Sequence, residues 1–296
     1  MAESDAVLVI YNPAAGRRRI HRLWLVLDIL AASGVTFQVV KTLRPGHAAE
    51  LARQAAVAGA DTVVAAGGDG TIADVATGLV GGRTKLGIIP LGTANVLARE
   101  LGLNFTPKGI AACLAFGRGR ELWPGVAEGP QGTRMFVQML GAGFDAQVVH
   151  RICLPLKRLI GRGAYVAQSL CELASYRFPR LDLRVDGVKL EGASVIISKG
   201  RLYGGPYLLA PGAHSNRPGF EVAIFHHRGQ LPALLYGAAL PLNLLPQTPG
   251  LELRSADRIE LSSPSPTPVQ ADGDRAGFLP LTIRNAAGPI TVVVDK

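Results

Sequence analysis

Charged residues are scarce in this chain. Only 18% of its 296 residues are Asp, Glu, Lys or Arg, whereas 48% are hydrophobic. A chain with this balance buries a large apolar core, so the composition excludes an intrinsically disordered protein. The length suits two domains better than one small core.

Aromatic residues and cysteines are few as well. Aromatics make up 6% of the chain, which carries a formal charge of +9. Such a charge suits nucleic acid, an anionic membrane surface, a polyanionic substrate or an arginine-rich surface without a partner. The sequence has no basic stripe with interleaved aromatics, so nucleic-acid binding is not expected. The three cysteines lack C-x-x-C spacing, which argues against a disulfide framework or a zinc site.

Long uninterrupted apolar runs are missing. The longest run, LPALLYGAALPLNLLP at 231–246, contains three prolines and is a poor membrane span. We expect this run to belong to the core rather than to an acyl-chain pocket. The first residues, MAESDAVLVIY, are acidic where a signal peptide would be basic. The sequence therefore predicts a cytoplasmic protein.

Strand-like and helix-like segments alternate through residues 1–120. Apolar runs predict the strands, and a spacing of 3.6 residues predicts the helices between them. The expected strands are 6–11, 35–40, 62–67 and 86–90, and the expected helices are 19–34, 47–59, 71–80, 93–102 and 108–117. Thr106 and Pro107 supply an N-cap and a first-turn proline for the last helix. This alternation predicts an α/β domain with a doubly wound parallel sheet.

The pattern changes after about residue 120. Short alternating segments, such as those at 180–198 and 220–227, predict strands, and Asp186-Gly187 predicts a hairpin turn. Two helices are expected near 165–176 and 231–240. We therefore expect a mostly antiparallel β domain over residues 121–296.

Three loops follow predicted strands of the first domain, NPAAGRRR at 12–19, GGDGT at 67–71 and PLGTAN at 90–95. None has the spacing of a P-loop or of the dinucleotide fingerprint. Alone, each is an ordinary turn between a strand and a helix. Together they should meet at the carboxyl edge of the sheet, which predicts a phosphate-binding site. The candidate amide, hydroxyl and side-chain donors are Asn12, Gly68, Gly70, Thr71, Thr93 and Asn95, with charge from Arg17, Arg18 and Arg19.

Asp69 places a negative charge inside this expected phosphate site. A carboxylate close to bare phosphate repels it. Two interpretations remain open. A divalent cation such as Mg²⁺, or its water shell, lies between the carboxylate and the phosphates, or else Asp69 caps the helix that follows.

A second acidic cluster, ADGD at 271–274, contains Asp272 and Asp274. An Asp-Gly pair is a strong turn signal, so a hairpin corner is one interpretation. If this part of the β domain reaches the nucleotide loops, a carboxylate here accepts a hydroxyl proton during phosphoryl transfer.

Taken together, these segments resemble the diacylglycerol kinase catalytic family, the soluble bacterial lipid kinases related to sphingosine kinases. The matching motifs keep their order over nearly the whole chain. They are NPAAG at 12–16, GGDGTIADVATGL at 67–79, LGIIPLGTANVLARELGL at 86–103, GAGFDAQVV at 141–149, LKRLIGRGAYV at 156–166, GRLYGGPYLLAPGA at 200–213 and ADGD at 271–274.

The resemblance implies an α/β nucleotide-binding catalytic domain like that of NAD kinases and lipid kinases, over residues 1–120. It implies an antiparallel β-sandwich domain for the lipid substrate over residues 121–296, whose last strand returns to the first domain. ATP would bind between the domains and, with Mg²⁺, transfer its γ-phosphoryl group to a diacylglycerol-like or sphingoid-like hydroxyl. Because the lipid lies in a membrane, transient peripheral association is expected.

The resemblance also implies roles for single residues. Asp272 would be the base that receives the hydroxyl proton, and Asp69 would be a catalytic residue at the nucleotide and its metal. Asp145 would join a metal or water network. The nucleotide would be bound by Asn12, Gly67, Gly68, Gly70, Thr71, Thr93 and Asn95.

The chain departs from the family pattern at several positions. Ala73 and Asp74 stand where Asn and Glu are usual, Lys199 stands where Asn is common, and Asp274 replaces Glu. The segment SNRPGFEV at 215–222 lacks an Asp-Gly pair, which puts a structural metal site of the second domain in doubt. Because both catalytic aspartates are retained, we expect an active enzyme.

Two alternatives remain open. A small-molecule kinase of the NAD kinase type shares a related GGDG turn, but that family carries an Asn-Glu pair that this sequence lacks. A catalytically inactive nucleotide-binding protein would fit the departures.

Residues 151–162, RICLPLKRLIGR, mix basic and apolar side chains. Such a segment fits peripheral contact between Arg151–Arg162 and an anionic membrane surface. A half-buried helix with a solvated basic face fits it equally well.

Overall fold

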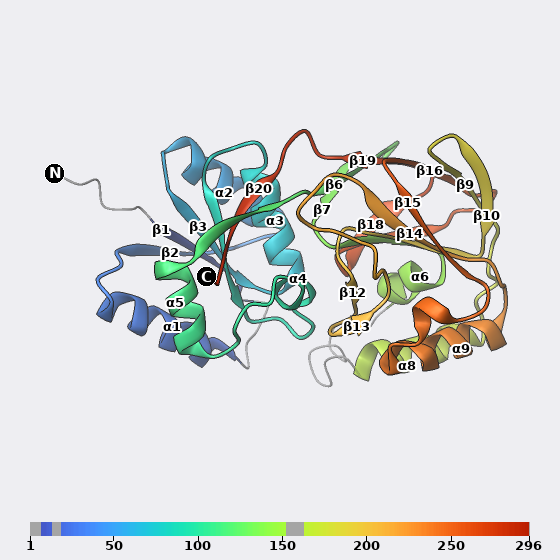
Figure 1. Ribbon diagram of the computed structural model, residues 1–296, viewed down its shortest axis with the longest axis horizontal. Helices are drawn as coiled ribbons and strands as arrows, with labels where there is room; N and C mark the ends of the chain where they lie inside the picture. The colour runs from blue at the N-terminus through green and yellow to red at the C-terminus, as the bar shows by residue number, and fades with distance from the viewer. Residues whose placement is uncertain (1–6, 14–18, 152–162, 296) are drawn as a thin grey trace. The chain divides into compact units, whose positions relative to one another are not determined.

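The computed structural model describes residues 7–13, 19–151 and 163–295. The chain forms two compact units, which consist of residues 1–123 with 287–296, and of residues 124–286 (Figure 1). The division after residue 123 lies close to the boundary expected at residue 120. The end of the chain returns to the first unit as a strand, β20 (Ile290–Val294).

The first unit contains one six-stranded sheet in the order β2-β1-β3-β4-β20-β5. The first five strands in this order pair in parallel, and β5 pairs antiparallel to β20. The other strands are β1 (Val7–Tyr11), β2 (Phe37–Lys41), β3 (Thr62–Gly67), β4 (Lys85–Pro90) and β5 (Arg118–Leu122). The expected parallel α/β sheet is therefore confirmed.

Helices cover this sheet because their apolar faces need its buried strands. They are α1 (Ile20–Ala32), α2 (His47–Val57), α3 (Asp69–Leu79), α4 (Val96–Glu100) and α5 (Pro107–Phe116). Leu23 and Leu27 of α1 pack with Ile110 of α5 against Val9 and Ile89 in one buried cluster. The predicted cap of α5 is confirmed, since the Thr106 hydroxyl accepts the amide of Gly109 at 3.1 Å.

The strand order places a topological switch point at β1. This strand pairs with β2 on one side and with β3 on the other. In doubly wound sheets the loops beside such a point diverge and leave a crevice for ligands at the carboxyl ends of the strands. The loops that follow β1, β3 and β4 all leave this edge of the sheet.

The second unit consists of two antiparallel six-stranded sheets, β10-β9-β16-β19-β6-β7 and β15-β14-β11-β8-β17-β18. The first sheet contains β6 (Gly125–Gly129), β7 (Gly132–Phe136), β9 (Leu181–Val185), β10 (Val188–Gly192), β16 (Arg258–Ser262) and β19 (Leu281–Asn285). The second contains β8 (Met139–Ala142), β11 (Ser194–Ser198), β14 (Phe220–Phe225), β15 (Leu251–Ala256), β17 (Pro268–Ala271) and β18 (Asp274–Phe278).

Alternate residues of both sheets form one buried cluster. Leu183 and Ile259 of the first sheet pack with Leu140, Ile197 and Val222 of the second. This shared core makes the second unit the predicted β-sandwich. It is accompanied by a small ribbon of β12 (Leu202–Tyr203) and β13 (Tyr207–Leu208), by α6 (Phe144–Arg151), α8 (Gly163–Leu173) and α9 (Gln230–Ala239), and by the 3₁₀ turns η2 (Leu240–Leu242) and η3 (Leu245–Gln247).

Two Asp-Gly pairs form tight hairpin turns, as their sequences predict. Asp186 and Gly187 join β9 to β10 with φ angles of 46° and 87°. Asp272 and Gly273 join β17 to β18 with φ angles of 50° and 82°. Positive φ at both central residues is typical of the type I′ turn, which matches the twist of antiparallel strands.

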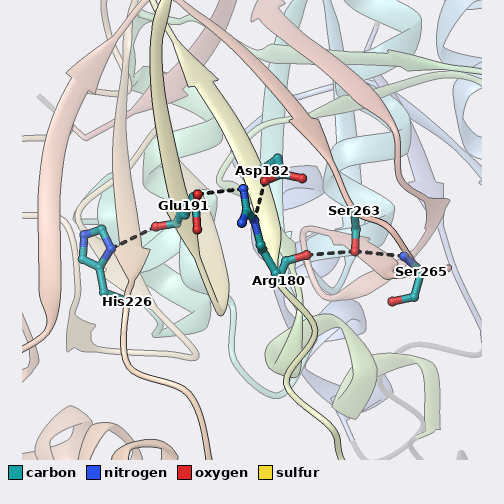
Figure 2. A network of polar contacts seen from close by, with 6 residues as sticks. All are labelled: Arg180, Asp182, Glu191, His226, Ser263 and Ser265. Atoms are coloured by element: carbon teal, nitrogen blue, oxygen red, sulfur yellow. Dashed lines mark hydrogen bonds and ion pairs between the residues drawn. The ribbon is translucent and has the colours of Figure 1, made fainter.

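A polar network lies on the surface of the sandwich (Figure 2). Arg180 pairs with Asp182 and with Glu191 at 2.7 Å each, and its carbonyl oxygen accepts the hydroxyl of Ser263 at 3.0 Å. The carbonyl oxygen of Glu191 lies 2.9 Å from Nδ1 of His226. Exposed ion pairs of this kind contribute little to stability, so we expect this network to add little to the stability of the sandwich.

We expected the apolar run at 231–246 to lie in the core, but most of it does not. It forms α9 with η2 and η3, and five of its leucines are exposed: Leu231, Leu234, Leu235, Leu242 and Leu244. Only Tyr236, Ala239 and Leu245 of its apolar side chains are buried. Across the described ranges, no helix combines the length and the apolar composition that a membrane crossing requires.

Candidate functional site

The loops after β1, β3 and β4 are joined by hydrogen bonds in the first unit. The side-chain amide of Asn12 donates to the hydroxyl of Thr71 at 3.0 Å. The carbonyl oxygen of Gly67 accepts the amides of Leu91 at 2.8 Å and Gly92 at 3.2 Å. The predicted meeting of the three loops is thus seen in the structure.

Gly68 and Gly92 allow two of these loops to touch. A Cβ atom on Gly92 would lie 2.6 Å from the Cα of Gly68, and a Cβ on Gly68 would lie 3.3 Å from the Cα of Gly92. No side chain fits at such a separation, so the backbones themselves form the wall of the site. We call Gly67–Thr71 together with Gly92 the glycine cradle.

The start of α3 directs backbone amides into the glycine cradle. Gly68 is the N-cap residue and has an extended backbone. The first hydrogen bond within the helix runs from the amide of Ile72 to the carbonyl oxygen of Gly68, at 3.1 Å. The amides of Gly70 and Thr71 precede it and have no acceptor within the helix. Such amides, together with the helix dipole, favour an anion.

Asp69 is the first residue of α3, directly after the N-cap residue Gly68. Its carboxylate faces the start of α4, where Oδ1 accepts the amide of Leu97 at 3.3 Å. Burial raises the pKa of this carboxyl group, while the amides of Leu97, Val96 and Asn95 and its own amide oppose the rise. Asp69 therefore joins the second and third loops by holding the first turn of α4.

Asn95 and Arg19 complete the wall of the third loop. Asn95 is 1% exposed and adopts a left-handed backbone, and its side-chain amide donates to the carbonyl oxygen of Gly92 at 2.8 Å. The same carbonyl oxygen accepts Nη1 of Arg19. Oδ1 of Asn95 is buried and has no hydrogen-bond partner in the part of the chain that the structure describes. Thr93 is exposed in this loop, and Arg17 and Arg18 lie outside the described residues.

These features fit a nucleotide phosphate better than a protein-bound metal. Unused amides, a surface without side chains and an unpaired buried acceptor suit the phosphates and hydroxyls of a nucleotide. Among the described residues, no three His, Cys, Asp or Glu side chains cluster closely enough to hold a metal ion. Magnesium bound mainly by phosphate oxygens and water needs no such cluster. A direct role of Asp69 as metal ligand stays a prediction.

In the second unit, the carboxylate of Asp272 binds three consecutive backbone amides. Oδ2 accepts from Val137 at 2.8 Å, and Oδ1 accepts from Gln138 at 2.8 Å and from Met139 at 2.9 Å. The amide of Asp272 returns a bond to the carbonyl oxygen of Met139 at 2.9 Å. The β17–β18 turn is thereby fixed to the connection between β7 and β8.

Asp145 is linked to the same turn through Gln270. The side-chain amide of Gln270 donates to Oδ2 of Asp145 at 2.8 Å, and its carbonyl oxygen accepts the amide of Gly273 at 2.9 Å. The hydroxyl of Tyr203 donates to the other oxygen of Asp145. Burial raises the pKa of this carboxyl group, and its two donors oppose the rise. Its predicted contact with a metal or water network stays a prediction.

The sequence pattern did not reveal Gln138, Gln270, Tyr203 or Gly92. Gln270 stands near the end of β17, two positions before Asp272 of the turn, and this closeness to the Asp-Gly pair is the only signal in the sequence. Gln138 is 1% exposed, and its Oε1 lacks a hydrogen-bond partner among the described residues. Nothing in the sequence around Gln138 indicates that its backbone amide donates to the carboxylate of Asp272.

Lys199, which stands where Asn is common, is fully buried. Its Nζ donates to the carbonyl oxygens of Arg217 at 3.1 Å and Gly219 at 2.7 Å, and to Oδ1 of Asn285 at 3.2 Å. Burial lowers the pKa of this amine to about 8, against the attraction of Asp257. The lysine amine therefore provides positive charge at these oxygens, two of which belong to the SNRPGFEV segment.

Arg151 ends α6 and is exposed. The rest of the segment predicted to touch a membrane, 152–162, lies outside the described residues. Of the predicted site residues, the first unit therefore brings together Asn12, Gly67, Gly68, Asp69, Gly70, Thr71 and Asn95, and the second brings together Asp145 and Asp272.

Comparison with known families accounts for both units. Residues 6–123 match the model of the diacylglycerol kinase catalytic domain. Residues 138–294 match the model of the YegS C-terminal NAD kinase beta sandwich-like domain. The first match covers β1 to β5 of the parallel sheet, and the second runs from β8 to β20, so it leaves out β6 and β7 of the sandwich and includes the strand that returns to the parallel sheet.

Similarity to known proteins extends over most of the chain. A probable lipid kinase YegS-like protein from Pseudomonas putida is 30% identical over 271 residues, 88% of each chain. A diacylglycerol kinase from Bacillus subtilis is 28% identical over 97% of this chain and 96% of its own. A crystal structure of a diacylglycerol kinase from Bacillus anthracis superposes with a TM-score of 0.73 at 19% identity, covering all of this chain and 98% of that one, which shows the shared fold. This chain belongs to the diacylglycerol kinase catalytic-domain family, with a YegS-type β-sandwich as its second domain.

Proposed function

We propose that this protein transfers the γ-phosphoryl group of ATP to the hydroxyl group of a membrane lipid. Family membership makes it a phosphotransferase with a lipid alcohol as acceptor. The observation that carries ATP as the donor is the glycine cradle, where the amides of Gly70 and Thr71 have no acceptor within the helix.

The proposed reaction forms one bond and breaks another. The lipid oxygen bonds to the γ-phosphorus, the bond from that phosphorus to the β,γ-bridging oxygen breaks, and ADP leaves with the electron pair. The hydroxyl proton passes to the Asp272 carboxylate. In such a transfer, positioning and charge stabilisation supply most of the catalysis.

Three amide donors fix the orientation of the Asp272 carboxylate. A fixed carboxylate has no freedom to turn away from an incoming hydroxyl, which suits a positioned base. Asp145, Gln270 and Tyr203 would hold the turn from the other side, because Gln270 binds both Asp145 and Gly273. Mg²⁺ bound to ATP would supply charge neutralisation at the phosphates.

The test is an acceptor panel with γ-labelled ATP. Diacylglycerol, a sphingoid base, ceramide and phosphatidylglycerol are presented in mixed micelles, and NAD is offered in a parallel reaction. A label that extracts into chloroform with at least one lipid supports the proposal. Formation of NADP without a lipid product would establish the NAD kinase alternative. ATP binding without transfer to any acceptor would establish an inactive nucleotide-binding protein.

A further inference from the structure

The outer face of α9 is apolar although it is exposed. Leu231, Leu234, Leu235 and Ala238 follow the i, i+3, i+4, i+7 spacing that places side chains on one face of a helix. All four are exposed, and Leu231 is 78% exposed. Such a stripe normally faces the protein core, whereas on α9 it faces outward.

The opposite face fixes α9 to the sandwich. The ring of Tyr236 packs edge to face on Phe225, with their centres 5.0 Å apart, and its hydroxyl donates to the carbonyl oxygen of Pro249 at 3.4 Å. Leu245 is buried in the turn that follows. Figure 1 shows α9 on the outside of the β-sandwich rather than between its sheets. The leucines cannot turn inward without breaking this attachment.

Exposed leucines continue along the chain beyond the helix. Leu242 is 67% exposed and Leu244 is also exposed. From 229 to 250 the sequence contains no Asp, Glu, Lys, Arg or His, although 18% of the whole chain is charged. A surface that only meets water would not exclude charge over such a length. We call the five exposed leucines of this stretch the leucine face.

Three basic residues precede the leucine face in the sequence. His226, His227 and Arg228 precede α9 and are exposed. His226 takes part in the surface network of Figure 2 and also contacts Glu252 at 2.9 Å, so Arg228 is the permanent cation of the three. The whole chain has a formal charge of +9. Exposed apolar side chains that follow a cation in a chain of net positive charge match the interface of an anionic bilayer, where the apolar groups enter the acyl boundary and the positive charge meets the head groups.

We propose that the leucine face of α9 is the surface by which this protein docks on an anionic lipid bilayer. The proposal rests on the proposed lipid kinase function, since the acceptor lies in such a bilayer. A second copy of the chain is a poorer occupant. A stable dimer buries about 800 Å² from each partner, whereas this face consists of five leucines on a short helix and its following turn.

The experiment measures binding to vesicles without ATP. The vesicles contain phosphatidylcholine with about one third phosphatidylserine, which gives an anionic surface. The variant Leu231→Glu/Leu235→Glu should bind at least about tenfold more weakly than the wild type, because two inserted apolar groups become charged. Val57→Glu, at a position of α2 that is 85% exposed, introduces a charge at an apolar surface residue elsewhere and should bind like the wild type. The variant Leu231→Ser/Leu235→Ser should show an intermediate loss of vesicle binding. It replaces the glutamate variant if the glutamates perturb folding.

Three outcomes would overturn the docking surface. They are no vesicle binding by the wild type, equal binding by the double variants, and conversion of a wild-type dimer to monomers by the same substitutions. Phosphorylation of a short-chain, water-soluble diacylglycerol separates docking from catalysis, since the double variants should retain it. Vesicle binding through these leucines without any lipid phosphorylation would instead reject the proposed function and keep the docking surface.

Discussion

The carboxylate of Asp272, in the turn between β17 and β18, accepts the backbone amide of Gln138 from the connection between β7 and β8 at 2.8 Å. Val137 and Met139 donate to the same carboxylate. The proposed base is therefore also a structural residue. Any variant at this position changes the backbone around the site as well as its chemistry.

Asp272→Asn should lower the free energy of unfolding by about 1–3 kcal/mol, because the new NH₂ group faces an amide donor and leaves it unsatisfied. Chemical denaturation followed by circular dichroism measures the loss. Asp274→Asn is the matched control, since Asp274 is exposed two residues further on, and its stability should not change. Equal stability of both variants would show that the three amide bonds contribute nothing net.

Gly92→Ala should weaken ATP binding by about tenfold or more. The added Cβ would lie 2.6 Å from the Cα of Gly68 and 2.7 Å from Oδ1 of Asn95, so the loops must separate and the amides of α3 lose their placement. Gly237→Ala adds the same atom where no atom lies within 4 Å, and it should bind ATP normally. Titration with a fluorescent ATP analogue compares the two. Unchanged affinity in Gly92→Ala would place the nucleotide elsewhere.

Lys199→Met should destabilise the protein by about 3 kcal/mol at neutral pH, because buried oxygens of Arg217, Gly219 and Asn285 lose their donor. Lys189→Met, at an exposed position of β10, is the control and should behave like the wild type. Urea unfolding measures both. A stable, folded Lys199→Met protein would show that these oxygens find other donors.

The pH dependence of the same pair follows from the lowered pKa of Lys199. The pKa of this amine is about 8 in the folded protein, against 10.5 for the free amine. Between these values the unfolded chain holds a proton that the folded chain has released, so stability rises with pH. The wild type should gain stability relative to Lys199→Met across this window. A constant difference would mean that the folded amine keeps its proton.

Gln270→Glu should destabilise the protein at neutral pH by placing a second carboxylate beside Asp145. The burial that already raises the pKa of Asp145 makes ionisation of both groups unfavourable, so both folded pKa values rise. Raised carboxyl pKa values stabilise the folded state relative to the unfolded one at low pH, and this contribution is lost as the pH increases. The stability gap to the wild type should therefore narrow as the pH falls. Thermal unfolding over a pH series tests this, and a gap independent of pH would contradict it.

Much of the fold follows from the sequence alone. Apolar runs that alternate with helical spacing require a parallel sheet covered by helices, and Asp186-Gly187 defines a hairpin because few residues adopt its backbone. The strand order and the pairing of β20 with β4 were beyond pattern reasoning, because they depend on contacts between distant segments. The resemblance, rather than the pattern, supplied the return of the last strand.

The candidate site was predictable where backbone conformation determines it. Three loops at one sheet edge and the glycines between them follow from the alternation. The side-chain partners do not, since Asp69 faces α4 and Asp272 faces the β7–β8 connection only because of the tertiary structure. The apolar run at 231–246 was assigned to the core because hydrophobicity alone does not show whether water or protein faces a helix.

The most direct test of the central claim is the rate of lipid phosphorylation by Asp272→Asn. It is measured below the melting temperature of the variant, and the affinity of the variant for ATP is measured as well. The account predicts a fall of about 10²–10⁴-fold with unchanged ATP affinity, as expected for a lost general base. A folded variant that phosphorylates lipid within a few-fold of the wild-type rate would contradict it and leave Asp272 with a structural role alone.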